Sequence, residues 1–424
     1  MKLKTISTMF FSLLFLLSNA KVQGQELRKE GRYYIAEVNK TFKVKEGGTL
    51  KMFDIRGDVD VETWTNKQVQ IHEIKKMDVY TEAEARAALA RAKSGYKKRD
   101  NVIEVDGGAF SRNWIKSRFE IRVPKLFNLD IETRAGDLSV NGVAGAVRLN
   151  TSGGEIILTD IGGEVDARTS GGDIEVNNSQ KAVTLKTSGG EIKLRNIGGP
   201  LDAKTSGGDI TLRGSEDRVN ISTSGGEIRI LDAGGRVKAR TSGGDIEIEN
   251  TKGVVKVHTS GGDIDLSKIG GALEASTSGG DIGGSSIQGG AVVSTSGGSI
   301  NLKNVRGGVQ GKTAGGDIQV EITLQNFTVD HRVDLRTASG EIVLYIPEKL
   351  PATIRAEIRI TDRWEDYHIY SDFPLTSSEE EENKEHYRRH TIASKGDING
   401  GGDLIELSTT NGDIHIKKLR KYFK

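Results

Sequence analysis

The sequence predicts an all-β protein. We expect a parallel β-solenoid of about eleven 18-residue coils, with a small α+β cap at the amino-terminal end and a β cap at the carboxy-terminal end. The first observation is an 18-residue period that runs from Thr133 to Thr313 without insertion or deletion. The second is that nine consecutive units, from Thr151 to Thr295, open with Thr-Ser-Gly-Gly. Loops change length at little cost, so this strict spacing indicates units that stack on identical neighbours.

Residues 1–24 have the features of a secretory signal peptide. Two lysines precede a mostly apolar run over residues 6–17, and cleavage after Ala20 or after Gly24 fits the small residues that follow. The run is too short to span a bilayer, and no later stretch is long and apolar enough to do so. We therefore expect an exported protein with no transmembrane anchor, located in the periplasm, at the cell surface or outside the cell.

The composition narrows the class of protein further. There is no cysteine among the 424 residues, which excludes disulfides, thiolate metal sites and a cysteine nucleophile. The net charge of +1 argues against nucleic acid as a partner. The 54 glycines and 5 prolines fit a chain that is rich in strands and turns.

Residues 25–128 are expected to form the amino-terminal cap. A helix is predicted over residues 82–93, which are rich in Ala, Glu and Arg and are followed by Gly95. Alternating apolar residues predict strands over residues 40–44, 50–55, 59–63, 69–74, 102–105 and 119–123.

Residues 129–326 are expected to form the solenoid, and the unit Thr151–Arg168 shows how. Alternation places Ile156 and Leu158 on the inner face of one strand, and Val165 and Ala167 on the inner face of a second. The two strands and two turns of a unit make one coil, and each strand should pair in parallel with its equivalent in the next coil.

Two further expectations concern the turns. The glycine pairs Gly162-Gly163 and Gly171-Gly172 are expected to supply the positive φ that tight corners need. The threonine that opens each unit, for instance Thr169, falls on the inner face by alternation. This predicts a buried threonine ladder in place of the flat exposed array of ice-binding solenoids.

Residues 327–424 are expected to form the carboxy-terminal β cap. The spacing lengthens from 18 to 24 at Thr337, a strand follows over residues 354–360, and the period returns at residues 408–416. The acidic run within residues 376–390 predicts an exposed loop. Both caps are expected to cover strand edges that the stack would otherwise expose.

A column of carboxylates is the strongest candidate for chemistry. Ten of the eleven units carry an acidic residue four positions after the threonine: Asp137, Glu155, Asp173, Glu191, Asp209, Glu227, Asp245, Asp263, Asp281 and Asp317. Calcium bridging successive coils would neutralise them, but each turn offers only one carboxylate. Hydrogen bonds from each residue's own Gly-Gly turn are the favoured explanation, so we expect no metal and no cofactor. Basic residues just before the threonine could add compensation: Arg168, Lys186, Lys204, Arg240 and Lys312.

Two other motifs have simple structural explanations. Arg56-Gly57-Asp58 matches an integrin-recognition tripeptide, but it lies between two predicted strands and is expected to form an ordinary hairpin turn. Among the seven histidines only His386 and His390 have an i,i+4 spacing, without a third metal ligand nearby.

The aromatic residues gather at the two ends. None occurs between Leu129 and Asn326, which argues against a sugar-cleaving groove along the rod because such grooves normally use aromatic faces. Trp364, Tyr367 and Tyr370 lie in the last cap. These residues are expected to form the core of the cap, or alternatively a ligand-binding surface. No catalytic residue is predicted anywhere in the chain.

Several segments outside the repeat have a distinctive sequence: Phe42–Leu50, Val59–Val61, Arg122–Pro124, Ser371–Leu375, Asn399–Gly402 and Ile405–Ile414. In these segments the chain resembles a bacterial family of exported β-strand-repeat proteins named putative adhesins, long classed as a domain of unknown function. The resemblance implies a β-solenoid at or outside the cell envelope, and it brings no catalytic residues.

These features favour a non-enzymatic exported β-solenoid that presents a polar surface for adhesion or for assembly at the envelope. Its partners would be cell-surface or envelope macromolecules. An enzyme acting on polysaccharide is the alternative, since many parallel β-helices are lyases or hydrolases. It would need a cleft where unlike groups converge, which a uniform repeat does not predict. A purely structural periplasmic protein is the third possibility.

Overall fold

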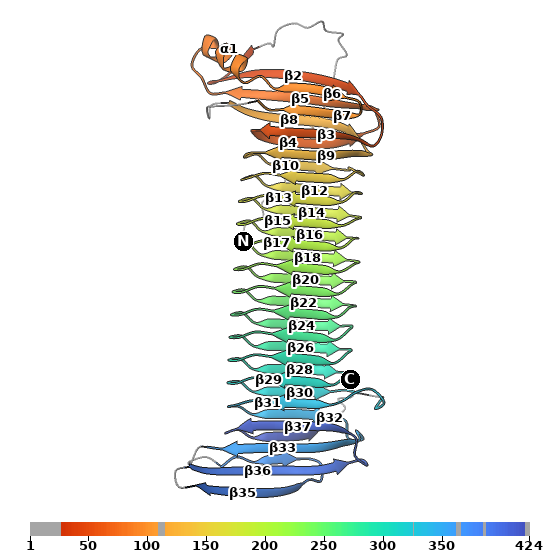
Figure 1. Cartoon of the computed structure of the whole chain (residues 1–424), viewed down its shortest axis with the longest axis vertical. Helices are drawn as coiled ribbons and strands as arrows, with labels where there is room; N and C mark the ends of the chain where they lie inside the picture. The colour runs from red at the N-terminus through yellow and green to blue at the C-terminus, as the bar shows by residue number, and fades with distance from the viewer. Residues whose placement is uncertain (1–26, 109–114, 325, 362–365, 385–386, 420–424) are drawn as a thin grey trace.

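The computed structural model describes residues 27–108, 115–324, 326–361, 366–384 and 387–419, and these form one rod of stacked coils (Figure 1). Two sheets run along the rod, and each coil contributes one strand to each sheet. The amino-terminal strands lie at one end of the rod and the strands after residue 350 lie at the other (Figure 1).

One coil of the repeat consists of β12 (Ile156–Ile161) and β13 (Val165–Arg168). β12 pairs in parallel with β14 (Ile174–Ser179), and β13 pairs in parallel with β15 (Val183–Lys186). In both pairs each residue faces the residue 18 positions later, because the corners keep the same length from coil to coil. The predicted parallel β-solenoid is therefore confirmed.

The remaining coils repeat this pairing. The first sheet continues with β10 (Leu138–Asn141), β16 (Ile192–Ile197), β18 (Ile210–Ser215), β20 (Ile228–Ala233), β22 (Ile246–Thr251), β24 (Ile264–Ile269), β26 (Ile282–Ile287), β28 (Ile300–Val305), β30 (Ile318–Ile322) and β32 (Ile342–Ile346). The second sheet continues with β11 (Val147–Asn150), β17 (Leu201–Lys204), β19 (Val219–Ser222), β21 (Val237–Arg240), β23 (Val255–His258), β25 (Leu273–Ser276), β27 (Ala291–Ser294), β29 (Val309–Lys312) and β31 (Val333–Arg336).

The inner faces of the two sheets form one continuous core that reaches from Val44 to Ile416. In β12 the alternate residues Ile156 and Leu158 are buried, and in β13 Val165 and Ala167 are buried. Each coil adds only a few apolar side chains, so a coil by itself cannot offset the conformational entropy lost when its backbone is ordered. Stability must come from the shared core and the ladders between coils.

A left-handed residue bends each of the first-sheet strands from β12 to β28 just before its end. Asp160, with a φ of 55°, is the example in β12, and the register pairs the residues on either side of it but skips Asp160 itself. Asn and Asp tolerate this backbone conformation better than most residues, because their short polar side chains can bond locally. The equivalent residues with positive φ are Gly142, Asn178, Asn196, Gly214, Asp232, Asn250, Lys268, Ser286 and Asn304.

The expected role of the corner glycines is wrong. Gly171 and Gly172 do not have positive φ. Instead, a Cβ atom on Gly172 would lie 2.0 Å from the carbonyl oxygen of Gly154 in the preceding coil. The glycine is required because the two coils approach closely, and the left-handed turn is made elsewhere in the coil.

The amino-terminal cap contains all six predicted strands and the predicted helix. A coil made of β3 (Gly48–Ile55) and β4 (Gly57–Trp64) stacks on β9 (Phe127–Thr133) and β10. On its other side lie β7 (Val102–Asp106) and β8 (Ile115–Pro124). The other elements are β1 (Leu27–Glu30), β2 (Tyr33–Lys43), β5 (Gln68–Met77), β6 (Gly95–Arg99) and α1 (Glu82–Arg91), which starts at a capping box on Thr81.

A buried ion pair connects the end of α1 to the sheet of this cap. Lys75 Nζ lies 3.3 Å from Glu73 Oε1, and it donates to the carbonyl oxygen of Ala92 and the hydroxyl of Ser94, just after the helix. Ser94 Oγ and the Tyr96 hydroxyl donate to the Glu73 carboxylate at 2.7 and 2.5 Å. Burial lowers the pKa of Lys75. Both charged groups thus have hydrogen-bond partners, which such burial requires.

The carboxy-terminal cap is closed by a strand pair that returns to the rod. β37 (Asp403–Thr410) pairs in parallel with β31 on one side and with β33 (Ala352–Ile360) on the other. β38 (Ile414–Lys418) lies in the same way between β32 and β34 (Ile369–Ser371). The return of the repeat period near residue 410 therefore marks one more coil, inserted between segments that precede it in the chain.

The acidic run is a strand and not the predicted loop. β35 (Thr376–Lys384) pairs with β36 (Tyr387–Ile398) in an antiparallel hairpin that extends the second sheet. Glu379 and Glu380 are exposed, as a charge run should be. Hydrogen bonds between the backbones of β35 and β36 outweigh the preference of charged residues for loops. Carboxylates on an edge strand also discourage pairing with another chain.

Candidate functional site

The threonine column is internal. Thr205 is 7% exposed, its Oγ1 donates a 2.9 Å hydrogen bond to the carbonyl oxygen of Gly190, and it accepts one from the N–H of Gly208. Each hydroxyl therefore bonds one glycine in the preceding coil and one in its own. The predicted buried ladder is confirmed, so these side chains are unavailable to a ligand.

The acidic column bonds between coils, which corrects the expectation that each carboxylate bonds its own turn. The N–H of Glu191 donates to Asp173 Oδ1 at 2.8 Å, and the N–H of Asp263 donates to Asp245 Oδ1 at 2.8 Å. Each Asp thus reaches the equivalent backbone in the following coil. Among the described residues Glu155, Glu191 and Glu227 accept no such bond, because their side chains are one methylene longer. The column is a structural ladder wherever it carries Asp.

Charge repulsion remains on this outer face of the first sheet. Partial burial, followed by the neighbouring carboxylates Asp137 and Asp173, raises the pKa of Glu155. Partial burial and the carboxylates of Asp263 and Glu247 raise the pKa of Asp265. In the part of the chain that the structure describes, no three acidic or histidine side chains converge in a way that could hold a metal ion.

The basic residues before each threonine do not compensate this column. Arg168 Nη2 lies 3.1 Å from Asp166 Oδ2, and Lys204 Nζ lies 3.4 Å from Asp202 Oδ1. Each pair lies within a single strand of the second sheet, the first in β13 and the second in β17. For Arg168 and Lys204 that expectation was wrong, because alternation puts each of them on the same outer face of the second sheet as the carboxylate two residues before it.

Arg56-Gly57-Asp58 is a coil corner and not a hairpin turn. It connects β3 in the second sheet to β4 in the first, and these strands do not pair with each other. A Cβ atom on Gly57 would lie 1.6 Å from the carbonyl oxygen of Ser117. The Asp58 carboxylate accepts a hydrogen bond of 3.1 Å from the N–H of Asp137, which makes it the first member of the acidic ladder.

Two of the three aromatic residues proposed as a ligand surface are described by the structure, and they differ in exposure. Trp364 lies outside the described residues. Tyr367 is half-buried and packs against the core, as expected of a cap residue. Tyr370 is 49% exposed, and its ring stacks on His415 with centroids 4.7 Å apart.

Histidines complete this exposed surface, and the sequence reasoning missed them. His368 lies 5.7 Å from the ring of Tyr370, and His415 Nε2 lies 3.1 Å from Glu341 Oε1. Alternation along residues 414–418 places His415 outward, which was the available signal. Its neighbour Tyr370 could not be inferred, because β34 and β38 are far apart in the sequence.

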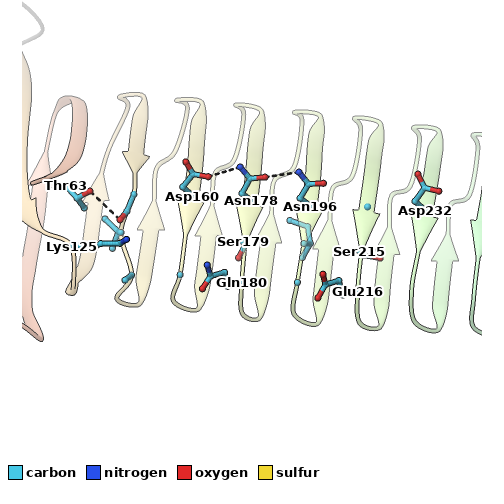
Figure 2. A pocket seen from close by; sticks show the side chains of 17 residues that line it. Thr63, Lys125, Asp160, Asn178, Ser179, Gln180, Asn196, Ser215, Glu216 and Asp232 are labelled. Carbon is cyan, nitrogen blue, oxygen red and sulfur yellow. Dashed lines mark hydrogen bonds between the residues drawn. The ribbon is translucent and has the colours of Figure 1, made fainter.

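A second surface lies along the edge where the left-handed residues project. Asn178 Nδ2 donates to Asp160 Oδ1 at 2.7 Å, and Asn196 Nδ2 donates to Asn178 Oδ1 at 2.8 Å, as Figure 2 shows. We call this row of side chains the amide ladder. It stops at Gly214, which has no side chain. Beside it runs a groove of about 1000 Å³ that extends from Lys125 to Asp232.

The fold and these surfaces define a parallel β-solenoid whose outward side chains form long polar columns. The chain belongs to the Toastrack DUF4097 family, whose profile matches residues 58–235 and 232–417. None of the curated proteins compared with the chain is a significant match. Among the described residues, no helix has the length and apolar content needed to cross a bilayer.

Three solved structures are similar to this chain. One, described as a putative adhesin from Parabacteroides distasonis, is 13% identical with a TM-score of 0.28, covering 68% of this chain and 97% of that one. A putative adhesin from Bacteroides fragilis is 12% identical with a TM-score of 0.19, covering 90% and 97%. A putative cell adhesion protein from Clostridium sporogenes is 8% identical with a TM-score of 0.17, covering 90% and 100%.

Proposed function

We propose that this protein is a non-enzymatic exported scaffold that binds cell-surface or envelope macromolecules, as an adhesin or an assembly module. The observation that carries this proposal is the parallel, in-register stacking of coil on coil in both sheets. In-register stacking repeats each outward position once per coil. A rod of this kind offers many equivalent weak contacts to a repetitive partner, and their avidity exceeds that of any single contact.

Export to the envelope is supported by the signal-peptide features of residues 1–24. Membership of the family that the sequence resembles supports the same location. The enzyme alternative is less well supported, because catalysis requires unlike groups that converge on one reacting atom. The outward groups here include carboxylates, amides, lysines and arginines, and the acidic column places the same kind of group in nearly every coil.

Binding and location are tested together. Intact cells that make the tagged protein are treated with protease, then fractionated, and purified residues 25–424 are incubated with envelope fragments. We expect digestion on intact cells and sedimentation of the purified chain with the fragments. Protection from protease together with no sedimentation would favour the purely structural periplasmic alternative.

The enzyme alternative has its own test. Purified residues 25–424 are expected to release no reducing ends from polysaccharides. Cleavage that disappears in Asp209→Asn would establish an enzyme and refute the proposed function, since Asn keeps the acceptor of the acidic ladder.

A further inference from the structure

The groove beside the amide ladder changes its lining with a period of two coils. At Ser179–Gln180 and Ser215–Glu216 a buried hydroxyl is followed by an exposed long polar side chain. At Ile197–Gly198, in the coil between them, an apolar side chain is followed by a residue with none, and Ile161–Gly162 repeats this two coils earlier. Two strand spacings make this repeat about 10 Å long.

A hydrogen-bond acceptor is left open where the amide ladder stops. Asn196 uses its Nδ2 to bond Asn178, but Gly214 offers no side chain to donate to Asn196 Oδ1, and no other described group does so. The Asn196 side chain is exposed, so a ligand can bring a donor to this point. The hydroxyl of Ser215 also has no hydrogen-bond partner among the described residues, but it is buried on the inner face of β18.

The charges along the groove limit the ligand further. The carboxylates of Asp160, Glu216 and Asp232 line it, whereas Lys125, at one end, is the cation among its lining residues. An anionic chain would be repelled over most of the length. Hydroxyl and amide N–H donors without negative charge fit best.

We propose that this groove binds a neutral, extended glycan built from disaccharide units. The inference rests on the proposed adhesive function and names its ligand class. Alternate sugars of an extended β-linked chain turn over, so that equivalent groups recur every second sugar, a length close to the two-coil period. Gln180, Glu216 and Asn196 would bond hydroxyl groups, and the coils with Gly162 and Gly198 would leave room for the sugar beside them. Binding would depend on these polar contacts, because the described residues that line the groove include no aromatic side chain. An extended β-strand peptide repeats every two residues, at about 7 Å, and does not match.

The test is calorimetric titration of purified residues 25–424 with cellohexaose and chitohexaose. Hexagalacturonate serves as the anionic probe and a proline-rich peptide as the protein probe. We expect at least one neutral hexamer to bind and neither of the other probes to do so. Absence of binding by both neutral hexamers at millimolar concentration would overturn the inference, as would a preference for the anionic or the peptide probe.

Gly214→Asn is the decisive variant, because it closes the gap in the amide ladder without removing any contact of the fold. Gly214 has a φ of 81°, and Asn occupies the equivalent left-handed position in neighbouring coils. Its new side chain would lie beside Asn196 Oδ1 and donate to it, which removes the open acceptor. We expect an unchanged or raised unfolding temperature and at least about a tenfold loss of glycan affinity, as expected for lost hydrogen bonds.

Ser286→Asn is the matched control. Ser286 has a φ of 57° in the same column but lies outside the groove. This variant should bind the hexamers as the unchanged chain does. Equal affinity in Gly214→Asn and the unchanged chain would refute the groove assignment. If both chains then still sediment with envelope fragments, the adhesive function stands and only its assignment to this groove fails.

Discussion

At the residue scale, a buried threonine hydroxyl stabilises the rod where it has hydrogen-bond partners and destabilises it where it has none. Thr205 bonds Gly190 and Gly208, so its hydroxyl is fully used. Thr251 is 2% exposed, and its hydroxyl has no hydrogen-bond partner among the described residues. Burial of an unpaired polar group costs free energy, whereas burial of a paired one does not.

Valine substitutions should therefore act in opposite directions. Thr205→Val should lower the free energy of unfolding by about 2 kcal/mol, because two glycine backbone groups lose their partner. Thr251→Val should leave it unchanged or raise it by about 1 kcal/mol. Urea unfolding followed by circular dichroism measures both changes. Equal losses in the two variants would contradict the hydrogen-bond argument and indicate a general cost of valine in the core.

A pH effect follows from the raised pKa of Asp265, which is caused by partial burial and then by neighbouring carboxylates. A folded-state pKa above the unfolded value means that the native state holds the proton more tightly. The stability from this group is therefore complete below the unfolded pKa and is lost as pH rises through the folded pKa. Asp265→Asn should raise the unfolding temperature at pH 7 and leave it unchanged near pH 3.

The matched control for this prediction is Glu274→Gln on the opposite sheet. The Glu274 carboxylate lies 2.5 Å from Lys256 Nζ, so its removal should bring no gain at either pH. Salt should reduce the gain from Asp265→Asn, because the interactions between these carboxylates are partly screened. A gain that persists at pH 3 would show that the charge is not its cause.

At the scale of the element, two adjacent glycines in one turn have different roles. A Cβ atom on Gly208 would lie 2.1 Å from the carbonyl oxygen of Gly190, which no side-chain rotation can relieve. A Cβ atom on Gly207 would meet nothing closer than 3.6 Å, an ordinary contact. The turn thus depends on one glycine of the pair.

Alanine substitution should separate these roles. Gly208→Ala should force the two coils apart and lower the unfolding midpoint strongly, by several kcal/mol in free energy, as backbone overpacking does. Gly207→Ala should change it by less than about 1 kcal/mol. Urea midpoints of the two variants measure the difference. Similar losses would mean that both positions need glycine for its backbone freedom and not for the approach of the coils.

At the scale of the whole molecule, the carboxy-terminal strands hold the end of the rod together. β37 is paired on both sides, with β31 and β33, and β38 is paired with β32 and β34. Removing them would leave the strands of the previous coil and of the cap without partners. Unpaired edges of this kind promote association between chains.

Ending the chain after Gly402 should therefore release the cap and cause aggregation. Limited proteolysis should cut between residues 346 and 402 in the shortened chain, and gel filtration should show large species. Ending the chain after Leu419 keeps both β37 and β38 and serves as the control. A monomeric, protease-resistant product from the shorter chain would show that the returning coil is dispensable.

The period of the coil, the strands within it and the side chains that point inward could all be predicted from the amino-acid sequence. These features depend on alternation along a single strand, a property of the backbone that adjacent residues reveal. The buried threonines and the capping strands could be predicted for the same reason, and the helix could be predicted from its local composition. The groove beside the amide ladder could not, because alternation does not show where a strand bends at a left-handed residue such as Asp160.

Which groups meet across coils became clear from the folded chain alone. The close approach at Gly172 and the bond from Glu191 to Asp173 each involve a partner that lies 18 positions earlier, in the preceding coil. The sequence reasoning assigned each of these features to its own turn or loop, and each assignment was wrong. Stacking places equivalent backbones of successive coils about 4.8 Å apart. At that spacing the hydrogen-bond partners of a turn come from the neighbouring coil, and the same coil leaves no room for a Cβ atom.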